Sequence, residues 1–546
     1  MCGIYGVINR KVRREQAMEC LDTMIHRGPD GFGLWQEDGV TLGHRRLAIL
    51  DLSSAGSQPM SYANERYWMT FNGEIYNFIE IREELQHKGY TFRGNSDSEV
   101  IMAAYCEWKE KCVDRFNGMW TFAIWDRQEK SLFLSRDRFG VKPLYYTEFP
   151  DGGFAFASEM KALLPLLEKV EPNKEMFDRY FADNHYESQP ECLIKGIKRF
   201  PAGSYAWIRN GKTEITRFWN TLDHLIEVPD TYEEQVEQFR ELFLDACKIR
   251  MRSDVTLGTG LSGGLDSSAT ICAMSYISRN CADERANKDW QHAYVACFPG
   301  TDLDETKYAK QVTDYLGIRH TFLTIDDAVP EREFLRQLYC FEELWGNPQV
   351  PMMELYKKER ELGTTVSLDG HAADELFAGY GFDVLKAYPD AKGKAEIDQI
   401  TMAYLNQRSE MGYDPSSAEF KRQRNKLYRD YMTKYYAKKL LGRADVSSAY
   451  ADHPNWKKLD NLNKVLFVST HETILPTLLR NYDRDSMASG VEIRMPFLDY
   501  RIVEFAFSIG WKSKLHGGFS KSIVRDACAD FMPHDIAYRR TKLGFN

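Results

Sequence analysis

The sequence predicts two successive domains, a β-rich domain over residues 1–215 and an α/β domain with a parallel sheet over residues 231–546. Two observations support this division. Short strand-like runs separated by turn residues recur in the first part, and strands alternate with helices in the second. A chain of 546 residues is long enough for two or three domains, and its 43% apolar content is typical of a globular protein.

The first domain is expected to consist of packed sheets, because its apolar runs are short and bounded by turn residues. A hairpin is expected over Ser204–Trp219, where Asn210-Gly211 is the strongest short hairpin signal. The other expected strands are Tyr67–Phe71, Thr121–Trp125, Ser131–Ser135 and Gly153–Ala157.

The second domain is expected to begin with a helix over Tyr232–Arg252, where apolar residues recur at helical spacing. The alternation that follows implies a parallel sheet with helices on both faces. Residues 385–465 predict polar helices, in which the basic cluster Lys421–Lys426 fits a solvated face better than a nucleic-acid patch. The expected strands are Val255–Leu261, Ala293–Phe298 and Thr364–Leu368, and the expected helices are Ser267–Ile277 and Glu305–Leu316.

Composition and charge exclude several classes of protein. The net charge of −9 disfavours a general polyanion binder. The sequence contains no run of 18 or more apolar residues, so no membrane span is expected. The N-terminal segment MCGIYGVINR lacks the features of a signal peptide, and the 11 cysteines include no C-x-x-C pair, which fits a reducing compartment. We therefore expect a cytoplasmic protein with neither a nucleic-acid nor a membrane partner.

Cys2 has an unusual position, because removal of Met1 would leave its thiol beside a free α-amino group. Such a residue combines a nucleophile with a base. On position alone, however, a buried cysteine that merely begins a strand is the more common case. Four polar motifs follow, each of which could be a turn or a cap: His26–Asp30, Arg45–Asp51 entering a strand, Phe71–Asn77, and Asn95–Glu99 opening a helix with an N-cap.

Together with Cys2, these motifs resemble the glutaminase domain of class II glutamine amidotransferases over most of residues 1–200. The resemblance implies an α+β domain of the N-terminal-nucleophile type, an αββα sandwich in which Cys2 attacks the glutamine side-chain amide. The Asn72 side chain and the Gly73 N–H would stabilise the oxyanion, for which one donor contributes roughly 2.7–4 kcal/mol. The glutamine itself would be held by Arg46 at its carboxylate, Asp97 at its amino group and Glu74 for orientation.

A second motif, Leu261–Ser268, follows an apolar strand and opens a helix. Its glycines would let the backbone approach phosphates, and a helix N-terminus favours anions. The loop lacks the Gly-Lys-Ser/Thr ending of a Walker loop, and it resembles the pyrophosphate-binding loop of ATP pyrophosphatases. The residues expected to bind ATP are Leu261, Ser262, Gly263, Gly264, Asp266, Ser267 and Ser268.

Carboxylates beside a triphosphate repel it unless Mg²⁺ intervenes. We therefore expect Asp266 and Asp374 to be linked to magnesium. Lys521 lies in a segment that predicts a helix, and it would deliver a cation to the departing pyrophosphate.

The two domains in this order resemble the asparagine synthetase (glutamine-hydrolysing) family over nearly the whole chain, including Asp369–Tyr380 and Asp483–Asp499. The resemblance implies an adenine nucleotide alpha hydrolase-like second domain that uses ATP and Mg²⁺. It implies an acceptor carboxylate, in the family L-aspartate, that is adenylated and then attacked by ammonia, and it leaves a homodimer open. It assigns Asp369 and Gly370 to ATP, and His371, Asp374 and Arg484 to the acceptor.

Two residues depart from the well-studied aspartate-using relatives, which have a glutamate in place of His371 and a serine in place of Asp369. His371 is either a tolerated substitution or a sign of another acceptor, such as a sugar uronate, a malonyl-type acid or a natural-product carboxylate. Asp369 would restore the lost negative charge if it pointed into the same pocket. A glutamine-independent amide or lactam ligase is a further alternative, against which Cys2 argues.

Overall fold

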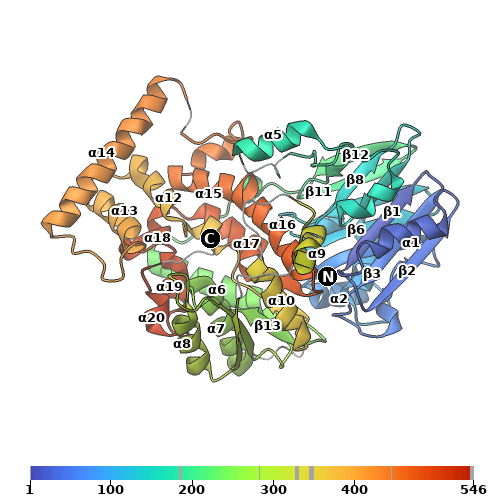
Figure 1. Cartoon of the computed structure of the whole chain (residues 1–546), viewed down its shortest axis with the longest axis horizontal. Coiled ribbons are helices and arrows are strands. Elements are labelled where there is room, and N and C mark those ends of the chain that lie inside the picture. Colours follow the sequence, from blue (N-terminus) through green and yellow to red (C-terminus); the bar gives the residue numbers. More distant parts are fainter. Residues whose placement is uncertain are drawn as a thin grey trace.

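The computed structural model describes residues 2–541 apart from 184–186, 188, 282, 284, 326–330, 344–349 and 444. Figure 1 shows the N-terminal strands on one side of the molecule and the largely helical C-terminal part on the other. The strands of these described residues form two antiparallel sheets of six strands each and one parallel sheet of five strands. Over the part of the chain that the structure describes, no helix is long and apolar enough to cross a membrane.

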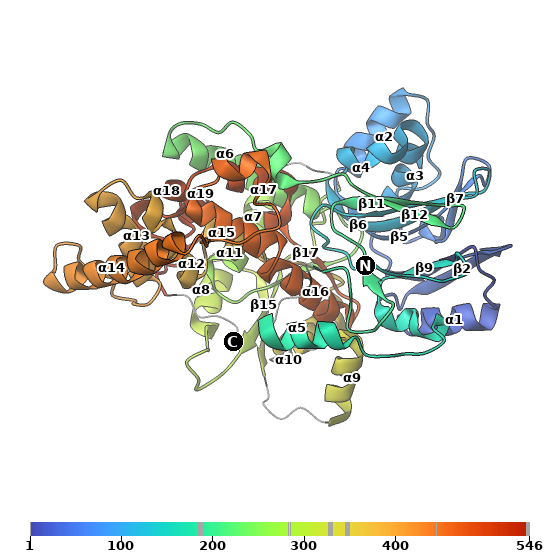
Figure 2. The same cartoon turned by 90° about the horizontal axis from the view of Figure 1, so that it is seen from above.

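The N-terminal domain consists of two stacked sheets with helices on their outer faces (Figure 2), which confirms the αββα sandwich. Helices α2 (Phe78–His87) and α3 (Asp97–Trp108) lie outside one sheet and α1 (Arg14–Asp22) outside the other. One sheet has the order β10 (Lys198–Arg199), β8 (Tyr145–Glu148), β9 (Phe154–Ala157), β1 (Gly3–Ile8), β3 (Val40–Arg46) and β2 (Gly31–Glu37). The other has the order β12 (Lys212–Arg217), β11 (Ser204–Arg209), β7 (Ser131–Arg136), β6 (Gly118–Asp126), β5 (Tyr67–Ile75) and β4 (Met60–Tyr62).

The predicted hairpin is confirmed. Strands β11 and β12 pair antiparallel around Asn210 and Gly211, whose φ angles are 51° and 71°. A two-residue turn with positive φ at both positions matches the twist of the paired strands, which is why Asn-Gly is favoured there. The other strands predicted in this domain overlap β5, β6, β7 and β9.

Apolar side chains from the facing sides of the two sheets fill the space between them. Ile4 and Leu42 come from one sheet, and Trp125 and Leu134 come from the other. Gly6 on β1 leaves room for the ring of Phe156, because a Cβ at that position would collide with this ring. The sandwich thus holds β1 rigidly, and Cys2 directly precedes β1.

The second domain contains the predicted parallel sheet, in the order β15 (Arg319–Thr324), β14 (His292–Cys297), β13 (Leu257–Gly260), β16 (Val366–Leu368) and β17 (Glu492–Arg494). The predicted helices correspond to α6 (Tyr232–Arg250), α7 (Leu265–Asn280) and α8 (Thr306–Leu316). From β13 the chain runs outward to β14 and β15 on one side of the sheet, and from β16 it runs outward to β17 on the other side. Ligands of open α/β sheets bind in the crevice that this reversal leaves at the carboxyl ends of the strands.

The remaining helices lie beyond this sheet. Helix α14 (Ala418–Leu440) projects from the molecule (Figure 1), and Phe420 and Met432 are its buried residues. The cluster Lys421–Lys426 lies on this helix with its side chains exposed or half-buried, as a solvated face requires. Helices α10 (Val350–Glu361) and α16 (Ile474–Met487) lie beside the sheet, and both contribute to the sites described below.

Candidate active sites

Cys2 is fixed by contacts with three different segments. Its backbone N–H donates to Asn72 Oδ1 at 2.8 Å, and its sulfur accepts from the Leu47 N–H at 3.5 Å. Arg27 Nε donates to the Cys2 carbonyl at 3.1 Å. Burial raises the pKa of the Cys2 thiol. Because the thiolate is the nucleophilic form, attack by this sulfur requires a nearby proton acceptor.

Asn72 and Gly73 lie side by side on β5, next to Cys2. Asn72 is fully buried, and its Nδ2 has no hydrogen-bond partner among the described residues. Gly73 has a φ of 151°, and a Cβ there would collide with the backbone of Met119 and Trp120 on β6. A buried donor without a partner is costly in a folded protein, so Asn72 Nδ2 is placed to serve a bound ligand.

The three residues predicted to hold glutamine come from three elements: Arg46 ends β3, Glu74 lies on β5 and Asp97 begins α3. Arg46 donates to the carbonyls of Ser53 and Asp51, at 2.9 and 2.5 Å. Asp97 accepts from the Ile75 N–H at 2.9 Å, and burial raises the pKa of Asp97 to about 7. Glu74 reaches toward the other domain, where its Oε1 lies 3.5 Å from Arg494 NH2.

Two local predictions about these motifs require correction. Strand β3 ends at Arg46, so Arg45–Asp51 leaves a strand where entry into one is predicted. Helix α3 begins at Asp97 as expected, but the Ser96 side chain makes no capping hydrogen bond. Instead, Glu99 accepts from the N–H groups of Arg93 and Gly94, and Asp97 from that of Ile75. These acids hold the preceding loop and β5 in place of a helix cap.

The loop Leu261–Ser268 is predicted to bind phosphates and is therefore called the phosphate loop. It connects β13 to α7 at the switch point of the parallel sheet. Gly263 has a φ of 78°, and a Cβ there would collide with the backbone of Ala309 in α8. Ser262 Oγ accepts from the Gly264 N–H at 3.1 Å. Gly264 is the N-cap of α7 and supplies no side-chain cap, so the first N–H groups of α7 suit an anion.

Lys521 lies between the two predicted magnesium ligands. Its Nζ is 2.5 Å from Asp266 Oδ2 and 2.5 Å from Asp374 Oδ1. Burial lowers the pKa of Lys521, but the two carboxylates outweigh burial and raise it. A Cβ at Gly379 would collide with the side chains of both Asp374 and Lys521. The structure therefore brings three predicted residues from distant segments into one cluster.

Asp369 follows β16 and is held by three donors. Its Oδ1 accepts from the Ser367 hydroxyl at 2.7 Å and from the Gly260 N–H at 3.1 Å. Its Oδ2 accepts from the Tyr356 hydroxyl at 2.7 Å. Burial raises the pKa of Asp369, but these bonds and the neighbouring His371 lower it overall. Asp369 therefore ties β16 to β13 and α10.

His371 lies beside Asp369, with its Nε2 3.5 Å from Asp369 Oδ2. The His371 ring stacks on Tyr482 of α16, with 3.6 Å between ring centroids and 19° between the planes. Gly370 lies between Asp369 and His371 in the sequence, and a Cβ there would collide with the backbone of Asp266 and Ser267. This close approach places His371 directly beside the phosphate loop.

Arg484, predicted to bind the acceptor, lies in the interface between the domains. It is fully buried, and it pairs with Glu159 at 2.8 Å and with Glu342 at 2.9 Å. Arg484 is two positions from Tyr482, which places the two side chains on different sides of α16. Of these two side chains, that of Tyr482 contacts His371. The contacts of Arg484 with Glu159 and Glu342 therefore do not place it beside His371, which is also assigned to the acceptor.

Sequence reasoning assigned no role to several buried residues that join these groups. Arg27 binds Asp483 in a bidentate pair at 2.7 and 3.0 Å, and it thereby links Cys2 to α16. Tyr356 and Tyr482 contact Asp369 and His371. The sequence motifs that contain Arg27 and Asp483 were both identified. The pairing of these two residues across 456 positions was not predicted.

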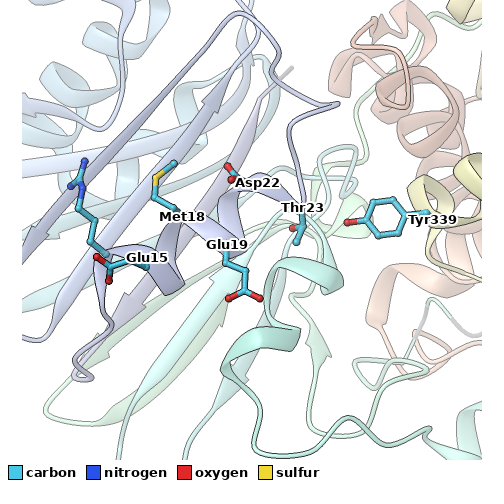
Figure 3. A pocket seen from close by; sticks show the side chains of 7 residues that line it. Glu15, Met18, Glu19, Asp22, Thr23 and Tyr339 are labelled. Carbon is cyan, nitrogen blue, oxygen red and sulfur yellow. The ribbon is translucent and has the colours of Figure 1, made fainter.

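Two hollows lie apart from the groups around Cys2, Lys521 and His371, although Asp483 lines one of them. One is a shallow surface pocket between α1 and α9 (Glu331–Phe341), lined by Glu15, Met18, Glu19 and Tyr339 (Figure 3). The other is a cavity of about 390 Å³ between the domains, lined by residues of both. Neither is lined by a residue that the sequence assigns to catalysis or binding.

Comparison with known proteins matches both parts of the chain. Residues 1–219 match the family described as glutamine amidotransferase domain, and residues 238–546 match asparagine synthase. The chain is 30% identical to asparagine synthetase [glutamine-hydrolyzing] 1 of Bacillus subtilis, over 100% of this chain and 87% of that relative. It is 32% identical to synthetase 3 of the same organism, over 99% and 86%. It is 28% identical to asparagine synthetase B of Escherichia coli, over 99% and 81%.

Proposed function

Because the chain belongs to the asparagine synthase family and carries a glutamine amidotransferase domain, we propose that it makes L-asparagine from L-aspartate, glutamine and ATP. The chain is a glutamine-hydrolysing carbon–nitrogen ligase, and the proposal concerns its acceptor and the roles of its residues. One observation supports it above the others. The chain combines a buried group around Cys2 and Asn72 with a second around Lys521 in the other domain.

In the first reaction, the Cys2 sulfur attacks the side-chain amide of glutamine, and ammonia leaves as a thioester forms. Asn72 Nδ2 and the Gly73 N–H stabilise the oxyanion, because they are fixed donors in a buried site. Arg46 pairs with the glutamine carboxylate, and ionised Asp97 holds its ammonium group. Water then releases glutamate from the sulfur.

In the second reaction, the acceptor carboxylate attacks the α-phosphate of ATP, which forms an acyl adenylate and releases pyrophosphate. The loop Leu261–Ser268 and the start of α7 hold the phosphates, and Lys521 stabilises the departing charge. Asp266 and Asp374 fit Mg²⁺, since this ion takes one or two carboxylates together with phosphate oxygens. They would hold the ion, which would neutralise charge on the triphosphate. Ammonia then displaces AMP.

The surroundings of His371 favour an acceptor that carries an ammonium group. Asp485 is fully buried, and neither of its carboxylate oxygens has a hydrogen-bond partner among the described residues. Burial raises the pKa of Asp485 well above its usual range, so its neutral form is favoured and it adds no negative charge. The negative group beside His371 is Asp369, whose pKa is lowered, and its charge favours aspartate over a malonyl-type acid or a uronate. Burial raises the pKa of Tyr482, the ring stacked on His371, and the nearby carboxylates of Glu375, Asp374 and Asp369 raise it further.

A pyrophosphate-release screen over candidate carboxylates, with glutamine and Mg²⁺ present, tests this proposal. We expect L-aspartate to give the fastest release and L-asparagine to appear in equal amount. Release with another acid, and none with saturating aspartate, would refute aspartate as the acceptor while leaving the amidotransferase chemistry intact. Amide formation that ignores both glutamine and ammonia would favour a glutamine-independent ligase.

A further inference from the structure

The cavity between the domains lies apart from both proposed reaction sites. Its volume of about 390 Å³ falls within the range of roughly 300–1,000 Å³ that small-molecule sites occupy. Its lining comes from the loop after β7 and from β12 in the first domain, and from α15 (Asn461–His471) and α16 in the second. Among its described lining residues, none is proposed to bind glutamine, ATP or the acceptor, so the proposed function gives this cavity no role.

Positive charge predominates among the described residues that line this cavity. Its two carboxylates are both engaged, because Glu187 pairs with Arg480 and Asp483 accepts two bonds from Arg27. Arg199 lies 3.6 Å from Glu343, which is outside the lining. The arginines of the lining are Arg136, Arg138, Arg199, Arg217 and Arg480.

Three of these arginines, Arg136, Arg138 and Arg217, have no carboxylate partner among the described residues. Arg136 and Arg138 donate to backbone carbonyls at 2.5–3.5 Å, and Arg217 donates to the Tyr450 hydroxyl at 2.6 Å. These acceptors carry no net charge. Burial lowers the pKa of Arg136 and Arg138, because it disfavours the charged form. An anion in the cavity would offset these positive charges.

Aromatic rings form another part of the lining. Phe467 and His471 on α15 lie 4.3 Å apart between ring centroids, and Phe139 lies 6.2 Å from His471 and 6.5 Å from Trp219. Burial lowers the pKa of His471 to about 3, so this ring is neutral near pH 7 and adds no charge. Aromatic side chains beside fixed guanidinium groups suit a ligand that combines a flat ring with an anionic group.

We propose that this cavity binds a small organic anion in which a phosphate or carboxylate group is attached to a flat ring. Guanidinium groups match the geometry of both kinds of anion, so the lining arginines would hold the charged group and the aromatic side chains would pack against the ring. The ligand would contact both domains, because both supply the lining. Asp483 connects this lining to Arg27, which donates to the Cys2 carbonyl.

Isothermal titration calorimetry of the full-length protein tests this site with charged and uncharged probes. GMP carries a phosphate and isophthalate carries carboxylates, each on a flat ring. Guanosine and isophthalamide are their uncharged counterparts. We expect at least one charged probe to bind, and its uncharged counterpart to bind roughly tenfold more weakly or worse, because charge-assisted hydrogen bonds are lost. The charged probe that binds more tightly identifies phosphate or carboxylate as the preferred group.

Two substitutions at the exposed edge of the cavity locate the bound probe. Ile215 and Arg217 are exposed, line the cavity and lie two positions apart on β12, so their side chains share one face of the strand. R217Q removes a positive charge and I215E adds a negative one, and each should raise the Kd of the charged probe roughly tenfold or more.

Matched controls lie outside the lining. R209Q changes an exposed arginine at the end of β11, and T216E places the same negative charge on the other face of β12. Both should bind the charged probe as wild type does. Three results would overturn the proposal: no binding of either charged probe at millimolar concentration, a Kd unchanged in both R217Q and I215E, or an equal loss of affinity in the controls.

Discussion

At the scale of single residues, buried polar atoms give the strongest evidence about function. Asn72 Nδ2 is a donor without a partner among the described residues, and it lies on the residue that accepts from the Cys2 N–H. A folded protein rarely leaves such a donor unsatisfied, because the cost is about 1–3 kcal/mol. An oxyanion formed beside Cys2 would satisfy it. The arrangement is therefore more easily explained by catalysis than by stability.

Replacement of Cys2 by alanine should abolish glutamine-dependent synthesis and spare synthesis from added ammonia. The reason is that Lys521, Asp266 and Asp374 lie in the other domain and do not contact Cys2. Asparagine formation from glutamine and from ammonium chloride, measured side by side, tests this. Glutaminase activity retained by C2A would show that another group is the nucleophile.

The glutamine site should respond to pH through Asp97. Burial raises the pKa of this carboxyl to about 7, so it gains its negative charge only as the pH rises through that value. Because the substrate ammonium group requires the charged form, KM for glutamine should fall as the pH rises from 6 to 8.

The variant D97N should lose this pH dependence and raise KM at pH 8 roughly 10- to 150-fold, which corresponds to 1.5–3 kcal/mol for a charge-assisted contact. The exposed Asp38 provides the control D38N, for which we expect wild-type values. If D97N and wild type show parallel KM profiles, Asp97 does not bind the ammonium group.

At the scale of elements, local signals predicted the strands and helices better than their partners. Asn210-Gly211 fixes a turn through its own φ preference, and the phosphate loop follows from residues adjacent in sequence. The partners of Asp369 depend on the sheet: Gly260 comes from β13 and Tyr356 from α10. Likewise, the position of Arg484 depends on which face of α16 meets the first domain. No periodicity in the sequence contains that information.

Gly370 tests the fit between two elements, the segment after β16 and the start of α7. A Cβ at this position would collide with the backbone of Asp266 and Ser267, which cannot move aside as a flexible side chain can. G370A should therefore reduce pyrophosphate exchange at least about fivefold, since overpacking typically costs 1–3 kcal/mol. Its glutaminase activity should not change.

Gly510 is a matched control, because a Cβ there would meet only open space and one distant carboxylate oxygen at 3.7 Å. G510A should exchange pyrophosphate as wild type does. Equal activity of G370A and G510A would mean that the loop can shift away from β16, and that its close approach is not required.

At the scale of the whole molecule, buried ion pairs join the two domains. Arg27 and Asp483 are both buried, and their bidentate contact connects the Cys2 carbonyl to α16. Buried pairs of this kind often add little net stability, because each charge loses its hydration. They do require one mutual arrangement of the two domains. Helix α16 carries both Asp483 and Tyr482, so the same helix reaches from Cys2 to His371.

Removal of one partner from this pair should cost far more than removal of both. In D483A, Arg27 keeps Glu159 but loses two short bonds inside a dry interface, so the free energy of unfolding should fall by about 3–5 kcal/mol. In R27M/D483L, no charge of this pair is left without its partner, and the loss should be smaller than that of D483A. Urea unfolding monitored by tryptophan fluorescence measures both. D314A, which breaks the exposed Lys310–Asp314 pair, should cost at most about 0.5 kcal/mol.

A double variant less stable than D483A would show that the pair stabilises the fold outright. If the double variant regains stability but still makes asparagine from ammonia more readily than from glutamine, the pair serves to hold Cys2 in place.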